Sequence, residues 1–224
     1  MKLKLLALSC CLAAAFTAQA QTTEVAQPEN KTYKPTAGDI TTEVAVNLDY
    51  GVFLNRGGIR VRKFMAADKA YRLGAEADYA YNKMGVEAYQ TSFSVSIAPG
   101  IEKHFAGTNR LSPYIGAELP IGYRGSKSES DHHIIEGGWS TSSYYSGNRA
   151  NFNIGLNGLA GVDYYFAPRF YAGFEIGAGF RYRKDKDIVT TYKNDFIPSE
   201  EHKGYHSISF SPFSTGGIRL GFAF

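Results

Sequence analysis

The sequence predicts an all-β fold: an antiparallel transmembrane β-barrel of eight strands, preceded by a signal peptide. Three observations lead to this prediction. Bulky apolar residues alternate with small or polar ones over many segments, the connections between these segments differ in length, and the chain starts with an export signal. A period of two places the two kinds of side chain on opposite faces of a strand.

The N-terminus has the pattern of a secretory signal peptide. Lys2 and Lys4 precede an apolar stretch at 5–16, and Ala18-Gln19-Ala20 provides a small-residue cleavage site. The stretch is shorter than the roughly 20 apolar residues that cross a bilayer. We therefore predict a signal peptide over 1–20. The alternative is lipid attachment at Cys10 or Cys11, which the preceding residues fit poorly.

The mature chain that this cleavage leaves has little chemical bias. Both cysteines lie in the signal peptide, so no disulfide is expected. Loss of Lys2 and Lys4 leaves 22 basic and 21 acidic residues, which argues against nucleic acid as a partner. Residues 21–39 contain Pro28 and Pro35 and no periodicity, and we predict a disordered periplasmic arm there. The barrel is predicted over 40–224.

Eight segments within 40–224 alternate with a period of two. They lie at about 44–52, 59–62, 71–81, 93–105, 111–123, 152–166, 170–182 and 206–224. An even number of antiparallel strands is typical of bacterial membrane barrels, and closure satisfies every backbone group in lipid. Prolines are confined to irregular positions in such sheets, so we expect irregularities at Pro99 and Pro212.

Short connections between the segments alternate with connections of more variable length. Short turns follow a phenylalanine at 64–68, 105–109 and 166–169, whereas two connections, 125–148 and 184–205, are long. Short periplasmic turns and long external loops are the asymmetry of membrane barrels. We therefore expect both termini to face the periplasm.

Size indicates which face points outward. A soluble barrel of lipocalin type also alternates, but with its apolar side inward, and eight strands leave room inside only for side chains or one small ligand. Here the apolar face is bulky and the other face is rich in Gly, Ala and Ser. Aromatic residues near strand ends resemble interfacial girdles. These are Phe64, Tyr71, Phe105, Phe166, Phe170 and Phe224 at one end, and Tyr81, Tyr123, Phe152 and Tyr182 at the other.

The inward face carries charges of both signs in nearly equal number. The predicted interior network consists of Asp49, Arg60, Arg62, Arg72, Glu76, Asp78, Glu102, Glu118, Asp163, Glu175, Arg181 and Arg219. Such charges could form a plug of salt bridges, or they could line a polar pore or proton path. Because an unpaired buried charge costs about 3–5 kcal/mol, we favour the plug.

Catalytic and metal sites are weakly indicated. Asp131, His132 and His133 lie in one long loop, and His202 and His206 could join them in space. Adjacent histidines point to opposite sides of an extended chain, and no phosphate-loop, hydrolase or zinc-protease motif is present. We predict no enzymatic activity, no cofactor and no metal.

The long loops contain aromatic residues among small polar ones. Trp139, Tyr144, Tyr145 and Tyr192 are candidates for contact with a protein partner, because loops on a rigid scaffold often carry recognition. Residues 188–192 have the composition of a strand that extends past the membrane. A loop that packs only on its neighbours is the equally weighted alternative.

The end of the chain carries a family resemblance. Ile218, Leu220, Phe222 and Phe224 alternate up to the final residue, which resembles the last strand of Gram-negative outer-membrane barrels. With the turn pattern and the export signal, residues 40–224 resemble the OmpA/OmpX-like "outer membrane protein β-barrel domain" family.

The resemblance implies a place in the bacterial outer membrane. It also implies membrane lipid and the barrel-assembly machinery as partners, with Phe222 and Phe224 as the assembly signal. The implied function is structural or interactive: membrane integrity, adhesion or a subunit of an envelope complex. The alternatives are a narrow passive channel and a rim-sited enzyme that modifies lipid or peptide.

Overall fold

The computed structural model of the chain describes residues 32–47, 53–54, 58–140, 148–214 and 217–224. The chain divides into two units, Met1–Lys31 and Thr32–Phe224, and all described residues lie in the second. The predicted signal peptide and most of the predicted arm therefore lie outside the described residues.

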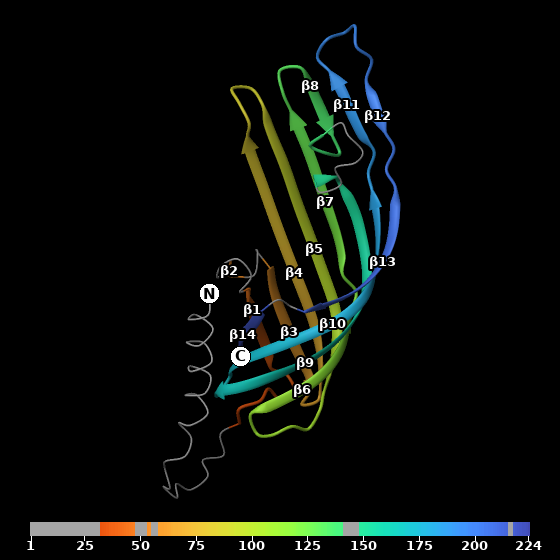
Figure 1. The fold of residues 1–224 in the computed structure, drawn as a ribbon. Coiled ribbons are helices and arrows are strands. Elements are labelled where there is room, and N and C mark those ends of the chain that lie inside the picture. The colour runs from red at the N-terminus through yellow and green to blue at the C-terminus, as the bar shows by residue number, and fades with distance from the viewer. Residues whose placement is uncertain (1–31, 48–52, 55–57, 141–147, 215–216) are drawn as a thin grey trace, which may run out of the picture. The chain divides into compact units, whose positions relative to one another are not determined.

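The described residues form one antiparallel sheet (Figure 1), which confirms the predicted all-β antiparallel fold. Its strands are β1 (Ile40–Asn47), β2 (Phe53–Leu54), β3 (Gly58–Ala66), β4 (Lys69–Lys83), β5 (Tyr89–His104), β6 (Leu111–Glu118), β7 (Ile121–Glu129), β8 (His133–Glu136), β9 (Asn151–Ala167), β10 (Phe170–Asp185), β11 (Ile188–Tyr192), β12 (Glu200–His202), β13 (His206–Ser214) and β14 (Gly217–Ala223). No helix of the described part is long and apolar enough to cross a membrane.

The strand pairings of the described residues return to their starting point. From β1 they run through β3, β4 and β5, then through β6 and β7 to β9 and β10, and through β14 back to β1. β6 and β7 occupy one position of this circuit, and β13 and β14 occupy another, since both pair with β10. The circuit therefore passes through eight strand positions.

Prolines interrupt the sheet at positions that differ in part from those expected. Pro120, which has no backbone N–H, separates β6 from β7, and its carbonyl accepts from the Gly155 N–H at 2.8 Å. Pro99 keeps its register opposite Leu73 on β4. On the other side of β5, the pairing with β7 stops at Ile97 and the pairing with β6 begins at Gly100, so the expected irregularity lies on that side. Pro212 also stays in register, opposite Ala178.

The register of the last strand position changes after Pro212. Between the Ile176–Ser214 pair and the Gly173–Arg219 pair, the partners along β10 shift by two residues. The irregularity therefore lies between β13 and β14 rather than at the proline itself.

The two strand faces differ in exposure as the alternation requires. On β5, Phe93, Val95, Ile97 and Ile101 are exposed, whereas Glu102 and His104 are buried. Phe64 was expected among the outward aromatics, and this expectation is wrong. Its side chain is buried, and its ring lies 5.1 Å from the His104 ring. It shares a face with Arg60 and Arg62, as its even position in β3 dictates.

The end of the predicted arm is ordered on the sheet. The Arg110 guanidinium donates to the Tyr33 hydroxyl at 2.9 Å and lies over its ring. The Gly38 N–H donates to the Phe64 carbonyl at 2.8 Å. For residues 32–39 the structure therefore differs from the disorder that we expected.

The two long connections contain further strands. β7 continues to Glu129 and pairs with β8, β8 pairs with β11, and β11 pairs with β12. These short strands lie at the same end of the sheet as the β4–β5 connection (Figure 1). The predicted strand at 188–192 corresponds to β11. We call β8, β11, β12 and the end of β7 the distal sheet.

Candidate functional site: the interior charge cluster

Nine charged side chains from several strands meet on the inward face. We call them the interior charge cluster: Glu43, Arg60, Arg62, Arg72, Glu102, Glu118, Asp163, Glu175 and Arg219. Each lies at an inward position of the period-two pattern. Antiparallel pairing then places them at similar heights, as in the Glu43–Arg60 and Arg62–Arg72 pairs.

Arg62 on β3 lies at the centre of the cluster and is fully buried. Its Nη1 donates to Asp163 Oδ2 at 2.7 Å and to Glu102 Oε2 at 3.2 Å, and its Nε donates to Thr41 Oγ1 at 3.2 Å. Its guanidinium also lies 5.0 Å from the centre of the Tyr171 ring. The planar cation is thus held by carboxylates at its edge and by an aromatic ring at its face.

Arg72 on β4 joins three carboxylates. Its Nη1 lies 2.9 Å from Glu102 Oε1 and 2.8 Å from Glu175 Oε2, and its Nη2 lies 3.1 Å from Glu118 Oε2. Glu175 also accepts a 2.6 Å hydrogen bond from the Tyr114 hydroxyl. This part of the cluster therefore connects β4, β5, β6 and β10 across the interior.

Arg219 on β14 and Arg60 on β3 share Glu43. Arg219 Nη1 donates to both Glu43 carboxylate oxygens, at 2.9 and 3.0 Å, and Arg60 Nη1 donates to Glu43 Oε1 at 2.7 Å. The Nη2 of Arg219 reaches Asp163 Oδ1 at 3.1 Å. Because its two Nη atoms bind different carboxylates, the orientation of the Arg219 guanidinium is fixed as well as its distance.

Glycines give the tyrosine rings of the cluster their space. A Cβ atom on Gly221 would collide with the ring of Tyr171, and one on Gly161 would collide with the ring of Tyr114. Both tyrosines are buried, and their hydroxyl groups donate to Glu43 and Glu175, respectively. The small residues on the inward face therefore serve close packing.

A chain of hydrogen bonds leads from the cluster to Ser112. His104 Nε2 lies 3.1 Å from Glu102 Oε2, and His104 Nδ1 lies 3.0 Å from Ser112 Oγ. The order of groups is that of a serine hydrolase triad, but all three side chains are buried. The His104 ring lies 5.1 Å from the rings of both Phe64 and Tyr114. In this structure the three groups are therefore packed away from solvent.

The structure separates the predicted network into two groups. It brings together Arg60, Arg62, Arg72, Glu102, Glu118, Asp163, Glu175 and Arg219. Glu76, Asp78 and Arg181 are exposed instead and make no ion pair with another described residue. They lie on the same strand faces, but nearer the distal end. Asp49 lies outside the described residues.

Sequence reasoning missed several members of the site. Glu43 contacts three arginines, and the alternation of β1 already placed it on the inward face. Tyr114 and Tyr171 also face inward at the period-two positions of β6 and β10. The sequence analysis assigned neither ring to a site, and the facing glycines reveal the space that the rings fill.

The predicted loop contacts belong to the distal end. Trp139 donates its indole N–H to the Thr91 carbonyl at 2.8 Å, and the Tyr192 ring lies 6.3 Å from the His133 ring. Tyr144 and Tyr145 lie outside the described residues. Among the described residues, no three His, Cys, Asp or Glu side chains are grouped to hold a metal.

One carboxylate at the distal end has a strongly shifted pKa. Hydrogen bonds from Tyr89, Lys127 and Lys193 lower the pKa of Glu129 to about 2. The donor–acceptor distances are 2.6, 3.1 and 3.3 Å, respectively. Glu129 therefore joins the start of β5, the end of β7 and the segment after β11.

The predicted assembly signal lies in an aromatic cluster at the other end of the sheet. The Phe222 ring lies 4.6 Å from the Phe170 ring and 4.9 Å from the Phe224 ring. The Phe224 N–H donates to the Ile40 carbonyl at 2.8 Å, so the final residue is joined to the start of β1.

Comparison with known proteins places the chain in a family. A family model described as "Putative OmpA-OmpF-like porin family" matches residues 78–224. The crystal structure of the N-terminal β-barrel domain of Pseudomonas aeruginosa OprF is similar at 18% sequence identity. That match covers 85% of this chain and 100% of the OprF domain, with a TM-score of 0.39. No curated protein matches. Because the family model covers more than half of the chain, the chain belongs to the OmpA-OmpF-like porin family of outer-membrane β-barrel proteins.

Proposed function

We propose that the chain is an eight-stranded outer-membrane barrel with a closed interior and a non-catalytic role in membrane integrity or in contacts made by its distal end. Both termini would face the periplasm, because the short turns, the start of β1 and Phe224 lie at the same end of the strands. Family membership supports the outer-membrane barrel, and the remaining statements rest on the geometry.

An exposed apolar band supports the lipid-embedded state. Bulky side chains that water would penalise remain exposed on neighbouring strands, including Leu73 at 49%, Ile97 at 50%, Phe174 at 50% and Leu156 at 57%. Exposed apolar patches of this extent mark contact with a membrane or another protein. The exposed apolar side chains extend over β4, β5, β9 and β10. A lipid bilayer can cover an apolar surface that spans so many strands.

The interior charge cluster is the observation that carries the closed-lumen proposal. Four arginines and five carboxylates fill the interior near the short turns, and the side chains of Arg62, Arg72, Glu102, Asp163 and Glu175 are fully buried. Buried charges of opposite sign at hydrogen-bond distance hold one another in place. An ion would have to displace these bonds to pass.

The distal sheet supports a contact role. Arg149 stabilises it from within by donating to the carbonyls of Lys186, His202 and Lys203. Apolar side chains are nevertheless exposed on its connections, where Phe196 is 95% exposed, and on the β4–β5 connection, where Val86 is 90% exposed. A rigid base that presents apolar tips is suited to a protein partner.

A narrow channel is the second candidate. The family description names porins, and Glu76, Asp78 and Arg181 are exposed on strand faces that point inward nearer the short turns. A channel would use these residues as a vestibule and would have to open the charge cluster.

Two measurements test the proposal. A detergent-solubilised barrel should change electrophoretic mobility on heating, and planar-bilayer recordings should show no stable conductance. A steady, ion-selective conductance of the wild type would replace the closed lumen by the channel.

Complementation of a strain that lacks the gene for this protein distinguishes a role in membrane integrity from a role in distal protein contacts. If the barrel alone supports the envelope, a variant with residues 193–199 shortened should restore detergent resistance as well as the wild type does. If distal contacts are required, the shortened variant should fold and fail to restore it. Failure of the wild type to restore resistance would contradict the integrity role.

A further inference from the structure

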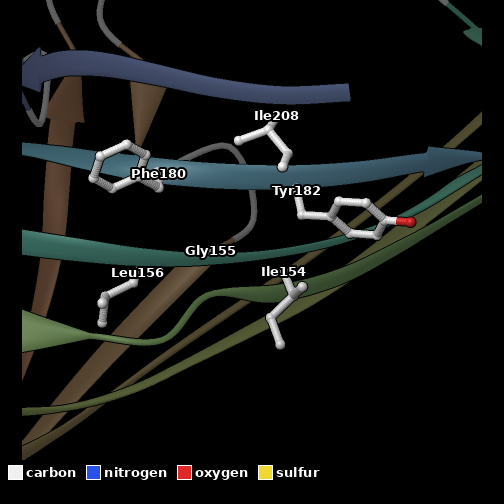
Figure 2. A pocket seen from close by; sticks show the side chains of 6 residues that line it. All are labelled: Ile154, Gly155, Leu156, Phe180, Tyr182 and Ile208. Atoms are coloured by element: carbon white, nitrogen blue, oxygen red, sulfur yellow. The ribbon is translucent and has the colours of Figure 1, made fainter. Parts of the chain in front are cut away.

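An apolar depression lies on the outward face between β9, β10 and β13. It is lined by Ile154, Leu156, Phe180, Tyr182 and Ile208, with the backbone of Gly155 (Figure 2). The side chains form two adjacent rows, because Tyr182 pairs with both Ile154 and Ile208, and Phe180 pairs with Leu156. Figure 2 shows Ile154, Tyr182 and Ile208 side by side on three neighbouring strands.

Cationic side chains border the distal end of this depression. One step beyond the Tyr182 row, Lys184 pairs with His206 on one side and with Phe152 on the other. All three side chains are exposed. Tyr123 pairs with Phe152, and the Lys186 ammonium lies 5.1 Å from the centre of the Tyr123 ring. Lys184 and Lys186 are thus neighbours on the outward face.

Asp185 and Asp187 flank Lys186 in the sequence, but Asp185 pairs with Arg183 and Asp187 pairs with Lys203. Neither Lys184 nor Lys186 makes an ion pair with a described residue, whereas Lys127 and Lys193 bind Glu129 and Lys203 binds Asp187. An ammonium group at an apolar edge that makes no ion pair with a described carboxylate attracts an anion. Membrane barrels gather aromatic residues at the level of the headgroups, and Tyr123, Phe152 and Tyr182 are the aromatic residues at this border.

We propose that this surface binds an anionic, phosphate-bearing lipid of the membrane leaflet at the distal end. The inference rests on the proposed membrane barrel. One acyl chain lies in the depression over Ile154 and Leu156, and Tyr182 borders the junction of chain and headgroup. Lys184 and Lys186 bind the phosphate, and His206 offers a ring nitrogen beside them.

Charge complementarity favours this occupant over a protein helix or a zwitterionic lipid. A protein would cover the apolar part without using two unpaired lysines. A zwitterionic headgroup would place its own cation against them. An anionic phosphate satisfies the lysines while its acyl chain covers the apolar side chains, and each lysine near a lipid surface contributes about 1 kcal/mol.

Native mass spectrometry of the full-length mature protein tests the proposal. The folded barrel is incubated in detergent with equal amounts of phosphatidylglycerol and phosphatidylcholine that carry the same acyl chains. The wild type should retain more phosphatidylglycerol. Lys184→Gln and Lys186→Gln should each lower the ratio of the two bound lipids about five-fold, the equivalent of 1 kcal/mol.

Two variants serve as controls. Lys63 is an exposed lysine on the outward face at the opposite end, so Lys63→Gln should leave the ratio unchanged. Lys184→Arg keeps the charge and should keep the preference. Ile208→Ala removes part of the depression, so it should lower retention of both lipids and leave their ratio unchanged.

The outcomes separate this inference from the proposed function. Equal retention of the two lipids by a wild type that shows heat-dependent mobility would overturn the lipid site and leave the barrel intact. So would an equal loss of preference in Lys63→Gln. Absence of heat-dependent mobility would contradict the membrane barrel itself. Because both lysines are exposed, Lys184→Gln and Lys186→Gln should each fold normally, so each single variant is a sufficient test.

Discussion

Replacement of Glu175 by Gln separates the effect of local ion pairing from that of net charge in the cluster. Four arginines face five carboxylates there, so removal of one negative charge balances the cluster in number. In position, however, it removes the partner that lies 2.8 Å from Arg72 and 3.4 Å from Arg60. If net charge governs the cluster, Glu175→Gln should raise the free energy of unfolding. If local ion pairing governs it, the same change should lower that free energy.

The geometry predicts destabilisation. Glu175 is fully buried, accepts from Tyr114 at 2.6 Å and contacts three arginines. Glutamine has nearly the same volume, so no cavity opens, and the change is electrostatic. Loss of one partner of a buried pair costs about 3–5 kcal/mol because the other charge remains buried. We expect Glu175→Gln to lie in that range.

Denaturant unfolding of the barrel in lipid vesicles measures this change. The midpoint should fall while the slope stays constant, since the surface exposed on unfolding is unchanged. Glu76→Gln is the matched control, because Glu76 lies on an inward strand face but is exposed, and its change should stay within about 0.5 kcal/mol. A neutral or stabilising effect of Glu175→Gln would show that net charge governs the cluster and would refute the pairing argument.

A double-mutant cycle locates the interaction. Arg72→Gln should also destabilise the barrel, because it leaves Glu102 and Glu175 without their closest shared cation. If the pair acts as a unit, the double variant should lose less than the two single variants combined, with a coupling of about 0.5–3 kcal/mol. Strict additivity would contradict a direct interaction.

Three further perturbations test other parts of the structure. Phe174→Arg should impair folding into lipid by about 2–4 kcal/mol if its side chain lies near the bilayer midplane, whereas Phe174→Leu should fold normally in the same vesicle assay. Gly221→Ala forces the Tyr171 ring to move and should cost about 1–3 kcal/mol by overpacking, which denaturant titration would detect. The pKa of Glu129 is lowered to about 2, so its contacts contribute fully above the ordinary carboxyl pKa of about 4.3 and are lost as pH falls toward 2. The protection of distal amides from hydrogen exchange, relative to their intrinsic exchange rates at each pH, should fall over this window, and Glu129→Gln should remove this change in protection.

The sequence could predict the faces of the strands but not the heights at which side chains meet. Arg72 and Arg181 are both arginines at inward positions of long strands, and alternation treats them alike. In the structure Arg72 binds three carboxylates, whereas Arg181 is exposed. Height depends on the stagger between neighbouring strands, which is a property of the whole sheet and not of one segment.

Local analogy also misled the sequence analysis at Phe64. Phe105 and Phe166 precede short turns and are exposed, so Phe64 before a similar turn was expected to match them. The β3–β4 connection contains a register shift between Phe64 and Ala66, and Phe64 keeps the inward parity of Arg62. The alternation within the strand was the better guide than the resemblance between turns.

The position of the cluster links closure of the interior to stability. Its members lie toward the short-turn ends of their strands, as at Arg62 in β3 and Asp163 in β9, whereas the inward face of β5 farther along carries Ser92, Ser94 and Ser96. In the proposed closed barrel this single layer of ion pairs would close the interior, whereas the inward face nearer the distal end carries the exposed charges Glu76, Asp78 and Arg181. Conduction would have to separate pairs such as Arg62 with Asp163, and separation of a buried pair costs several kcal/mol. Conductance and stability should consequently change together, so that any variant that conducts is also easier to unfold, and a conducting variant with wild-type stability would show that ions pass by a route other than the cluster.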